Sequence, residues 1–307
     1  MSLYDDGMDT RQLEYFVAVA EELNFTRAAA RLFAAQSTVS AGVAALEREL
    51  GGRLFERDAH GVRLTGVGEA ALAEARTGLQ SIERLRDLVV GEGALRGAVR
   101  VGIFTNLTSI DLPGIMGEFR RRHPGVDLRL GPSPSGSTGL ADDVRQGRID
   151  VAFLGLPDSA PGVIELTLAE VPFVAVLPEG HPLAAGDGAL PLEALAAERW
   201  VDAREGFGNR VTLDRALTSA GLTRQIATEV SDLGEIPRFV AAGLGVAALP
   251  TLTVIPTPGA VTRPLNPAIE WRLSVIAHPR PGAAARALVG LIAERFGRAV
   301  PPTLEAS

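Results

Sequence analysis

The stretch from Gln36 to Leu50, QSTVSAGVAALEREL, decides how the N-terminal part of this chain folds. Its apolar residues recur at steps of three and four, the spacing of the buried stripe of a helix, and include Val39, Val43 and Leu46. The opposite face carries small and polar side chains. A helix that enters the major groove of DNA needs short side chains there, with hydroxyls and amides that bond to base edges. A plain three-helix bundle would show the same stripe, so this pattern alone leaves both interpretations open.

Two further helices are predicted before this one. The segment Arg11 to Glu22 has apolar residues at helical spacing. Asn24 and Thr26 are good N-caps for a second, short helix that ends near Leu32. A short turn then leads into the third helix. This order is that of a helix-turn-helix, in which the N-terminal residues of the last helix reach deepest into the groove.

The same region resembles the LysR-type transcription regulators. The shared segments follow one another with matching gaps: Gln12–Glu21, Phe25–Ala29, Gln36–Ser40, Leu46–Gly51, Leu54–Arg57 and Leu64–Thr65. The resemblance implies an α-helical winged helix-turn-helix domain over residues 8–65, with residues 1–7 as an extension before the usual start at Met8. It also implies contacts with double-stranded DNA. We expect base contacts from Gln36, Ser37, Thr38 and Ser40, and backbone contacts from Thr26, Arg27, Arg57, His60 and Arg63.

The sequence departs from the family at the third helix. Ser37 stands where the family often has Pro, and Ala41-Gly42 stands where a basic residue followed by Gln is common. Acidic residues also outnumber arginines by one over residues 8–65. Because phosphate contacts need local positive charge, we expect weaker non-specific DNA affinity than in a basic relative, offset by dimerisation.

A long helix is predicted over residues 66–94, which contain no proline before the glycines at 91 and 93. Its apolar residues recur at three- and four-residue steps and form a seam suited to close helix pairing. Packing on its own domain is the plain alternative. In the family this segment is a linker that pairs two chains. We therefore expect a homodimer or homotetramer whose contact includes Leu72, Leu79, Ile82 and Val89.

Residues 95–303 alternate between strand and helix patterns, which predicts an α/β domain with mainly parallel sheets. The resemblance extends through this part, for example at His123–Val126, Gly147–Ala152 and Ala241–Pro250. It implies an effector domain of two Rossmann-like subdomains, similar to a periplasmic binding protein. The first subdomain would hold residues 95–156 and 265–303, and the second residues 157–264. Two strands would cross between them, near Leu154–Pro157 and Pro256–Leu265.

A ligand cleft is expected where strand ends meet helix N-termini, because these ends offer free N–H groups that favour anions. Three loops and one capping serine fit this description. An ordinary turn is the plain alternative for each loop. The expected effector-binding residues are Thr105, Asn106, Leu107, Ser135, Ser137, Thr138, Gly208, Asn209, Arg210 and Ser231. Hydroxyls, amides and one arginine suit a small anion, most simply a carboxylate.

Composition narrows the function classes. The 307 residues include no cysteine, and none of the four histidines has a paired carboxylate or a metal-ligand spacing nearby. No nucleophile elbow or phosphate-binding loop is present either. We therefore expect no enzyme activity, no metal and no cofactor. No run of eighteen apolar residues and no signal peptide is seen, so a cytoplasmic protein without membrane contact is expected.

Two other functions remain open at this point. A transport protein that binds solutes would need an export signal, which the sequence lacks. A ligand-binding protein of the periplasmic-binding type, whose helix-turn-helix no longer binds DNA, is suggested by Ala41, Gly42 and the net charge of the chain, −7.

Overall fold

The computed structural model describes residues 9–58, 61–90, 95–104, 107 and 110–305. The chain divides into two compact units, residues 1–91 and 92–307, which are described separately below. None of the helices in these ranges combines the length and apolar character needed to cross a membrane.

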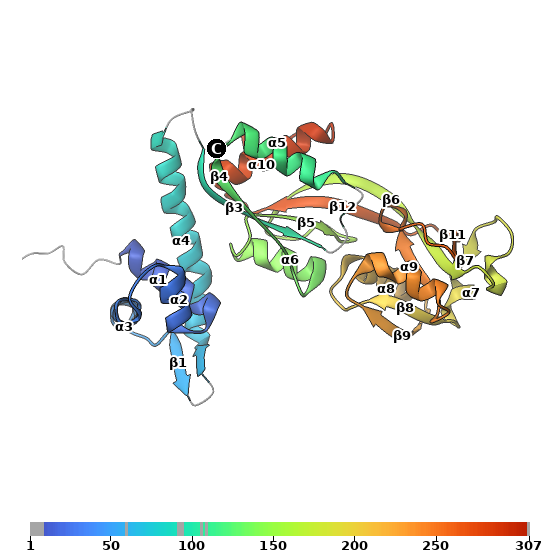
Figure 1. Cartoon of the computed structure of the whole chain (residues 1–307), viewed down its shortest axis with the longest axis horizontal. Coiled ribbons are helices and arrows are strands. Elements are labelled where there is room, and N and C mark those ends of the chain that lie inside the picture. The colour runs from blue at the N-terminus through green and yellow to red at the C-terminus, as the bar shows by residue number, and fades with distance from the viewer. Residues whose placement is uncertain (1–8, 59–60, 91–94, 105–106, 108–109, 306–307) are drawn as a thin grey trace, which may run out of the picture. The chain divides into compact units, whose positions relative to one another are not determined.

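The first unit contains the helix-turn-helix (Figure 1). Its elements are α1 (Thr10–Glu22), α2 (Phe25–Arg31), α3 (Gln36–Leu50), β1 (Phe55–Asp58) and β2 (Gly61–Leu64). The amide oxygen of Asn24 accepts hydrogen bonds from the first backbone N–H groups of α2, at 2.9 and 3.0 Å. Gly51 adopts the left-handed conformation that ends α3. The antiparallel β1–β2 pair forms the wing.

The long helix α4 (Gly66–Val90) belongs to the same unit. Leu72 and Ala75 on its first half pack into the hydrophobic core formed by α1, α2 and α3. The buried guanidinium of Arg76 pairs with Glu21 of α1 at 3.1 Å, and Glu21 also pairs with Arg31 of α2 at 2.6 Å. Burial alone would raise the pKa of Glu21, but its bonds to Arg31 and Arg76 outweigh burial and lower it. One carboxylate thus joins three helices.

The first subdomain of the second unit has a mixed sheet rather than the mainly parallel one expected. Strand β3 (Arg96–Ile103) pairs in parallel with β4 (Gly125–Pro132) and β5 (Val151–Gly155). The late strand β12 (Glu270–Ala277) pairs with β5 in the antiparallel sense, because it returns from the second subdomain. The helices of this part are α5 (Leu112–Arg122), α6 (Gly136–Arg145), α10 (Ala283–Arg295) and α11 (Pro302–Glu305).

The strand β6 (Ile164–Pro178) carries the chain from the first subdomain to the second (Figure 1). Its first half pairs with β12, and its second half, from Phe173, pairs with β10 (Ala247–Pro250) and β11 (Ala260–Asn266). The crossing therefore lies near Pro172, later than the segment Leu154–Pro157 that the sequence suggested. The return crossing joins β11 to β12 and begins at Asn266, just after the predicted segment. A local apolar pattern does not show which half of a fifteen-residue strand pairs with which partner.

The second subdomain is built on β10, β11 and a short parallel sheet of β8 and β9. Its strands are β7 (Leu190–Pro191), β8 (Arg199–Ala203), β9 (Gln225–Val230), β10 (Ala247–Pro250) and β11 (Ala260–Asn266). Its helices are η1 (Pro182–Ala184), α7 (Leu192–Ala196), α8 (Gly208–Ser219), η2 (Leu233–Glu235), α9 (Ile236–Ala241) and η3 (Thr251–Thr253). One hydrophobic core runs through both subdomains.

Candidate DNA-binding and effector-binding sites

The N-terminal end of α3 presents three polar side chains to solvent. Gln36, Ser37 and Thr38 are all exposed, while Val39 directly after them is fully buried. Ala35 at the N-cap makes no side-chain capping bond, so no side chain covers the start of the helix. The exposed end of α3 can therefore approach a partner closely with hydroxyls and an amide.

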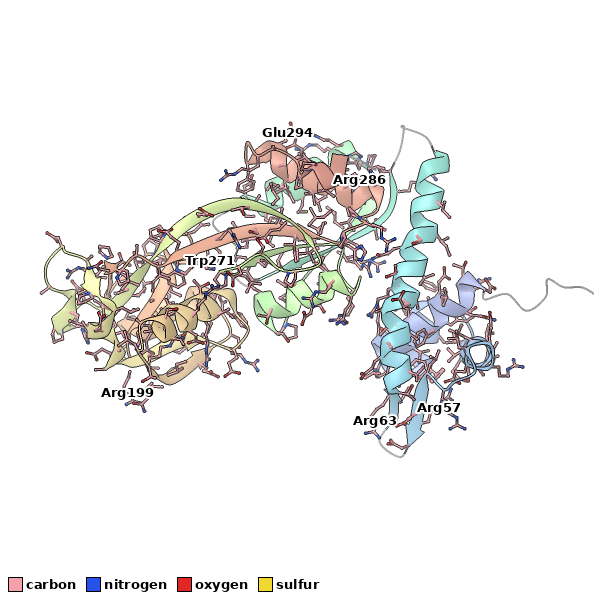
Figure 2. All side chains as sticks on the ribbon, turned by 180° about the vertical axis from the view of Figure 1, so that it is seen from behind. Arg57, Arg63, Arg199, Trp271, Arg286 and Glu294 are labelled. Carbon is pink, nitrogen blue, oxygen red and sulfur yellow. The ribbon has the colours of Figure 1, made fainter. Side chains whose placement is uncertain are left out.

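Arg57 of the wing lies against this helix. Its guanidinium stacks on the ring of Phe25, 3.8 Å from the centroid, and donates to the hydroxyl of Ser40 at 3.4 Å. Phe25 is itself held edge-on against Phe55. These contacts are with a ring and a hydroxyl rather than with a carboxylate. The positive charge of Arg57 thus stays beside α3, and Figure 2 shows Arg57 and Arg63 on the wing.

Of the other residues that we expect to contact the DNA backbone, those that the structure describes already take part in bonds within the protein. Arg27 forms an ion pair with Glu22 at 3.2 Å, and Arg63 forms one with Asp58 in the wing. Thr26 is exposed at the first turn of α2, where its N–H is bonded to the cap. His60 lies outside the described residues. Arg27 and Arg63 therefore start from ion pairs with neighbouring acids, unlike Arg57.

Gly42 accounts for one departure of the sequence from the family. A Cβ at this position would lie 2.4 Å from the ring of Tyr15, so a side chain here would displace that ring. Tyr15 is buried against α3 as part of the core. The glycine is thus required by the packing of α1 on α3.

The predicted pairing residues of α4 divide into two groups. Leu72 is buried in the core of its own unit, so its surface is already used. Leu79 and Ile82 are only half-buried and lie outside that core. Leu85, one turn further on, is 62% exposed. The side chain of Val89 lies outside the described part.

In the second unit, three elements from both subdomains meet at Gly155, the last residue of β5. Ser137 of α6 accepts the N–H of Gly155 at 3.2 Å. A Cβ on Gly208, the first residue of α8, would lie 1.5 Å from the Gly155 carbonyl oxygen, and one on Gly155 would lie 2.1 Å from the indole of Trp271. Only glycine allows backbones to approach this closely. The N-termini of α6 and α8 are therefore packed together around one residue.

The space left at this junction is a closed cavity of about 10 Å³. Such a volume holds about one water molecule. Its lining comes from both subdomains and includes Ser137, Gly208, Asn209 and Trp271. Within the part of the chain that the structure describes, neither polar atom of the Asn209 amide nor the Trp271 indole nitrogen has a hydrogen-bond partner. Buried polar atoms without partners are rare in folded proteins.

The remaining predicted effector residues lie elsewhere. Thr105 and Asn106 fall outside the described residues, and Leu107 is buried in the hydrophobic core. Ser135 is exposed, and Thr138 donates to backbone carbonyls of residues 135 and 206. Asp232, not Ser231, caps the helix η2. Of the ten predicted residues, Ser137, Gly208 and Asn209 line the closed cavity.

Arg210 is surrounded by carboxylates. It bonds to Glu229, lies 3.5 Å from Asp214 and 3.6 Å from Glu205, and donates to the Ala203 carbonyl. Burial alone would lower the pKa of this guanidinium, but Glu229, Asp202 and Asp214 outweigh burial and raise it. Its charge is thus neutralised within the second subdomain. Sequence patterns could not show this, because Glu229 is brought there by β9.

The LysR family is shown by direct comparison. Residues 10–69 match the family described as bacterial regulatory helix-turn-helix protein, lysR family. Residues 92–297 match the LysR substrate binding domain. The chain belongs to the LysR family of transcription regulators. Its helix-turn-helix is a DNA-binding domain, and its second unit is an effector-binding domain.

Several curated relatives of this LysR-type regulator are transcription regulators too. It is 35% identical over 243 residues to the regulator ShiR of Corynebacterium glutamicum, which covers 78% of this chain and 82% of ShiR. It is 33% identical to a probable hydrogen peroxide-inducible genes activator of Mycobacterium avium, over 88% of this chain and 84% of the relative. It is also 33% identical to the dual regulator GltC of Bacillus subtilis, over 81% and 83%.

Solved structures of full-length relatives agree with the fold. A full-length OxyR variant from Pseudomonas aeruginosa superposes with a TM-score of 0.73 at 28% identity, covering 94% of this chain and 95% of that one. Full-length BenM gives a TM-score of 0.55 at 25% identity, covering 96% and 100%. The regulator CbnR bound to its target DNA shares the fold, with a TM-score of 0.58 at 24% identity over 94% and 100%.

The similarity to a probable hydrogen peroxide-inducible genes activator does not imply a thiol mechanism for this LysR-type regulator. The oxidation of a cysteine to sulfenic acid or a disulfide requires a cysteine, and the 307 residues contain none. A hydrogen peroxide signal read by a thiol is therefore excluded for this sequence.

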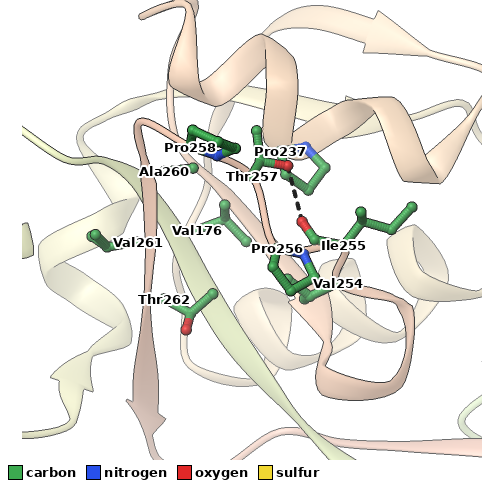
Figure 3. Close-up of a pocket in the computed structure, with 10 residues that line it drawn as sticks. All are labelled: Val176, Pro237, Val254, Ile255, Pro256, Thr257, Pro258, Ala260, Val261 and Thr262. Atoms are coloured by element: carbon green, nitrogen blue, oxygen red, sulfur yellow. Dashed lines mark hydrogen bonds between the residues drawn. The ribbon is translucent and has the colours of Figure 1, made fainter.

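A larger cavity lies away from the junction (Figure 3). It has a volume of about 660 Å³, and its lining comes from β6, α9, β11 and the segment from Val254 to Pro258. Proline and aliphatic side chains dominate this lining. The hydroxyl of Thr257 is already bonded to the Ile255 carbonyl at 2.9 Å. Its lining thus offers few polar atoms to a ligand, whereas the junction brings Ser137, Asn209 and Trp271 together.

Trp271 is the site residue that sequence reasoning missed. It reads as one apolar position in a late strand, but the pairing of β12 with β5 places it against Gly155. Figure 2 shows it where the long strands pass between the subdomains. A tryptophan at the start of a crossing strand was the available signal, since its N–H needs a partner when buried.

Proposed function

We propose that this regulator reads its operator with the exposed start of α3, binds as a dimer paired along α4, and responds to a small carboxylate held between the effector subdomains. In this proposal each predicted segment has its own function. Residues 8–65 bind DNA, residues 66–94 pair two chains, and residues 95–303 bind the effector. The exposed polar end of α3, with Arg57 fixed beside it, is the observation that carries the proposal.

In this proposal, bases are read by Gln36, Ser37, Thr38 and Ser40. Arg57, together with Thr26, Arg27, His60 and Arg63, contacts the DNA backbone. Support comes from the exposure of Gln36 to Thr38 and from the contact of Arg57 with Ser40. The ion pairs of Arg27 and Arg63 are exposed, and such pairs contribute little, so phosphate can replace the acids.

The effector part of the proposal assigns the carboxylate to N–H and hydroxyl donors rather than to Arg210. The N-termini of α6 and α8 meet at Gly155, and both carry partial positive charge. Ser137 and Asn209 lie at these ends and line the closed cavity. Because the cavity holds only about one water, a carboxylate requires the subdomains to separate or to rotate. That change is the signal passed to the DNA-binding unit.

The other function left open by the sequence was a ligand-binding protein that has lost DNA binding. It is not favoured, because residues 10–69 match the regulatory helix-turn-helix and Gly42 is explained by packing against Tyr15.

The test uses the full chain and the DNA upstream of its own gene. Binding to this DNA and to a scrambled duplex is measured by fluorescence anisotropy over a range of salt, with and without a panel of small carboxylates. The parent is expected to bind the upstream DNA more tightly and to respond to at least one carboxylate. Ser137→Ala should bind DNA as the parent does and lose most of that response.

Ser219→Ala, the same change on the exposed end of α8, is the matched control and should respond as the parent does. Equal affinity for both duplexes would contradict the DNA-binding proposal. An unchanged response of Ser137→Ala would contradict the assigned effector site, and the regulator assignment would stand.

A further inference from the structure

Three polar atoms at the subdomain junction have unused hydrogen-bonding capacity. Trp271 and Asn209 are each only 3% exposed, and both line the closed cavity. The indole nitrogen of Trp271 and both amide atoms of Asn209 lack partners among the described residues. Leaving such atoms unpaired in a buried site costs stability, so three of them at one junction call for an explanation.

The atoms come from opposite subdomains. Trp271 lies on the crossing strand β12, held edge-on by Phe104 at a centroid distance of 6.0 Å and packed over Gly155. Asn209 is the second residue of α8 in the other subdomain. Ser137 of α6 completes the set, since its oxygen accepts from Gly155 and its own hydrogen is left to donate.

The set therefore contains three donors and one acceptor. The donors are the Trp271 N–H, the Ser137 O–H and the Asn209 NH₂ group, and the acceptor is the Asn209 carbonyl oxygen. A bare carboxylate has only acceptor atoms. It could satisfy the three donors but would leave the Asn209 oxygen buried and unpaired.

We propose that Trp271 and Asn209 form the recognition pair for the effector, and that the effector carries a hydroxyl beside its carboxylate, as 2-hydroxycarboxylates do. Once the subdomains have separated or rotated to admit the effector, its carboxylate accepts from Trp271, Ser137 and the Asn209 NH₂ group, and its hydroxyl donates to the Asn209 oxygen. This inference rests on the proposed effector site. Sites that hydrogen-bond a ligand hydroxyl reject the analogue without it, because their own polar group is left unpaired.

The chain provides its own reporter, because it contains two tryptophans. Trp200 is fully buried and donates to the Leu195 carbonyl at 3.0 Å, so its indole signal serves as an internal reference. The full chain labelled with ¹⁵N at the indoles is titrated with three matched pairs: glycolate and acetate, lactate and propionate, malate and succinate. Thermal shift measures binding independently in the same samples.

We expect at least one hydroxy acid to move the Trp271 signal and leave that of Trp200 in place. Its deoxy partner should bind about tenfold to a hundredfold more weakly. Asn209→Asp keeps the side-chain shape but replaces the NH₂ group with a negative oxygen, and should weaken binding about a hundredfold. Gln146→Glu makes the same change on the exposed end of α6 and should leave binding as in the parent. Trp271→Phe should weaken binding about tenfold.

Three results would overturn the proposal. Equal binding of both members of every pair would remove the role of the hydroxyl. Binding seen by thermal shift without movement of the Trp271 signal would remove Trp271 from the site, and the effector site itself would survive. If no carboxylate binds by either measurement, the recognition pair and the carboxylate proposal both fall, and the DNA-binding proposal is unaffected.

Discussion

The two polar sites of this regulator differ in how they meet solvent. At the start of α3, Gln36, Ser37 and Thr38 are exposed on a helix whose buried face is already packed. At the starts of α6 and α8, Ser137 and Asn209 are enclosed, and both helices pack against Gly155 at the end of β5. Both sites use short polar side chains at helix N-termini.

This difference separates two ways of binding. The exposed site is formed before its partner arrives, so substitutions there change affinity and leave the fold alone. The enclosed site must change its packing to admit a ligand, so substitutions there change the balance between conformations as well. An effector can shift that balance only by as much as its affinity differs between the two states.

The largest effect is expected on the surface of the first unit where α4 has unpartnered apolar residues. Replacing Leu79 and Ile82 together with Glu should give monomers in sedimentation and abolish operator binding, because two half-sites can no longer be held together. The control double variant, Val67→Glu with Ala70→Glu, adds the same charge to exposed positions of α4 and should stay dimeric. A dimeric Leu79/Ile82 variant would show that these residues do not pair the chains.

The next effect belongs to the enclosed site. Gly208→Ala places a methyl group 1.5 Å from the Gly155 oxygen, so the two subdomains cannot keep their contact. We expect a loss of about 3 kcal/mol in the free energy of unfolding of the effector domain, seen as a lower thermal midpoint. Gly180→Ala, with nothing within 4 Å of the added carbon, is the control and should unfold like the parent. Unchanged stability of Gly208→Ala would mean that the junction is already open in solution.

A smaller change is expected at the exposed site. Gln36→Ala should cost about 1–3 kcal/mol on the specific operator and little on random DNA, without a change in thermal stability. Arg57→Ala should weaken binding to both DNAs and reduce the salt slope by about one. An equal loss of Gln36→Ala on both DNAs would place its contact on the backbone instead.

The smallest effect concerns a buried charge in the second subdomain. Burial raises the pKa of the Asp202 carboxyl from 3.8 to about 6, despite its contact with Arg224. The folded state thus holds a proton that the unfolded chain has released. The stabilisation that comes from binding this proton is fully present below the pKa of the unfolded chain. It is lost as the pH rises through the pKa of the folded state.

Between about pH 5 and pH 6.5, the parent should therefore lose about 1 kcal/mol more stability than Asp202→Asn, as measured by chemical unfolding. Charges in the first unit are mostly exposed and should give no comparable slope. Parallel pH profiles of parent and variant would show that Asp202 is ionised throughout this range.

The sequence predicts the two sites unequally well, for a physical reason. Both ends of α3 are signalled locally, by the apolar stripe and by Gly51, and the structure confirms Gln36–Leu50 as a helix. The start of α6 is not signalled locally, because residues 136–139 show no apolar period and this turn is held by a contact with residue 206.

Long-range pairing decides the rest of the enclosed site. Trp271 reaches the junction only because β12 pairs with β5, more than a hundred residues earlier. Arg210 looked like a free cation in the sequence, but β9 and the segment before α8 supply its carboxylate partners. The contacts of Trp271 with Gly155 and of Arg210 with Glu229 leave no trace in local spacing, whereas Asp214 stands four residues after Arg210 on the same helix.

The bridge from Arg76 through Glu21 to Arg31 has a consequence for operator architecture. It connects α1 and α2 to α4. In a dimer paired along α4, the distance between the two helix-turn-helix domains is therefore set by the positions at which the two α4 helices touch. Sliding one α4 helix along the other by a single helical turn would move its helix-turn-helix domain by about 5.4 Å. Two half-sites on the same face of the DNA duplex lie roughly 34 Å apart, so this shift is a fraction of their separation. The register in which the two α4 helices pair would then select the half-site spacing. Operators with a different spacing would bind weakly, whatever their base sequence.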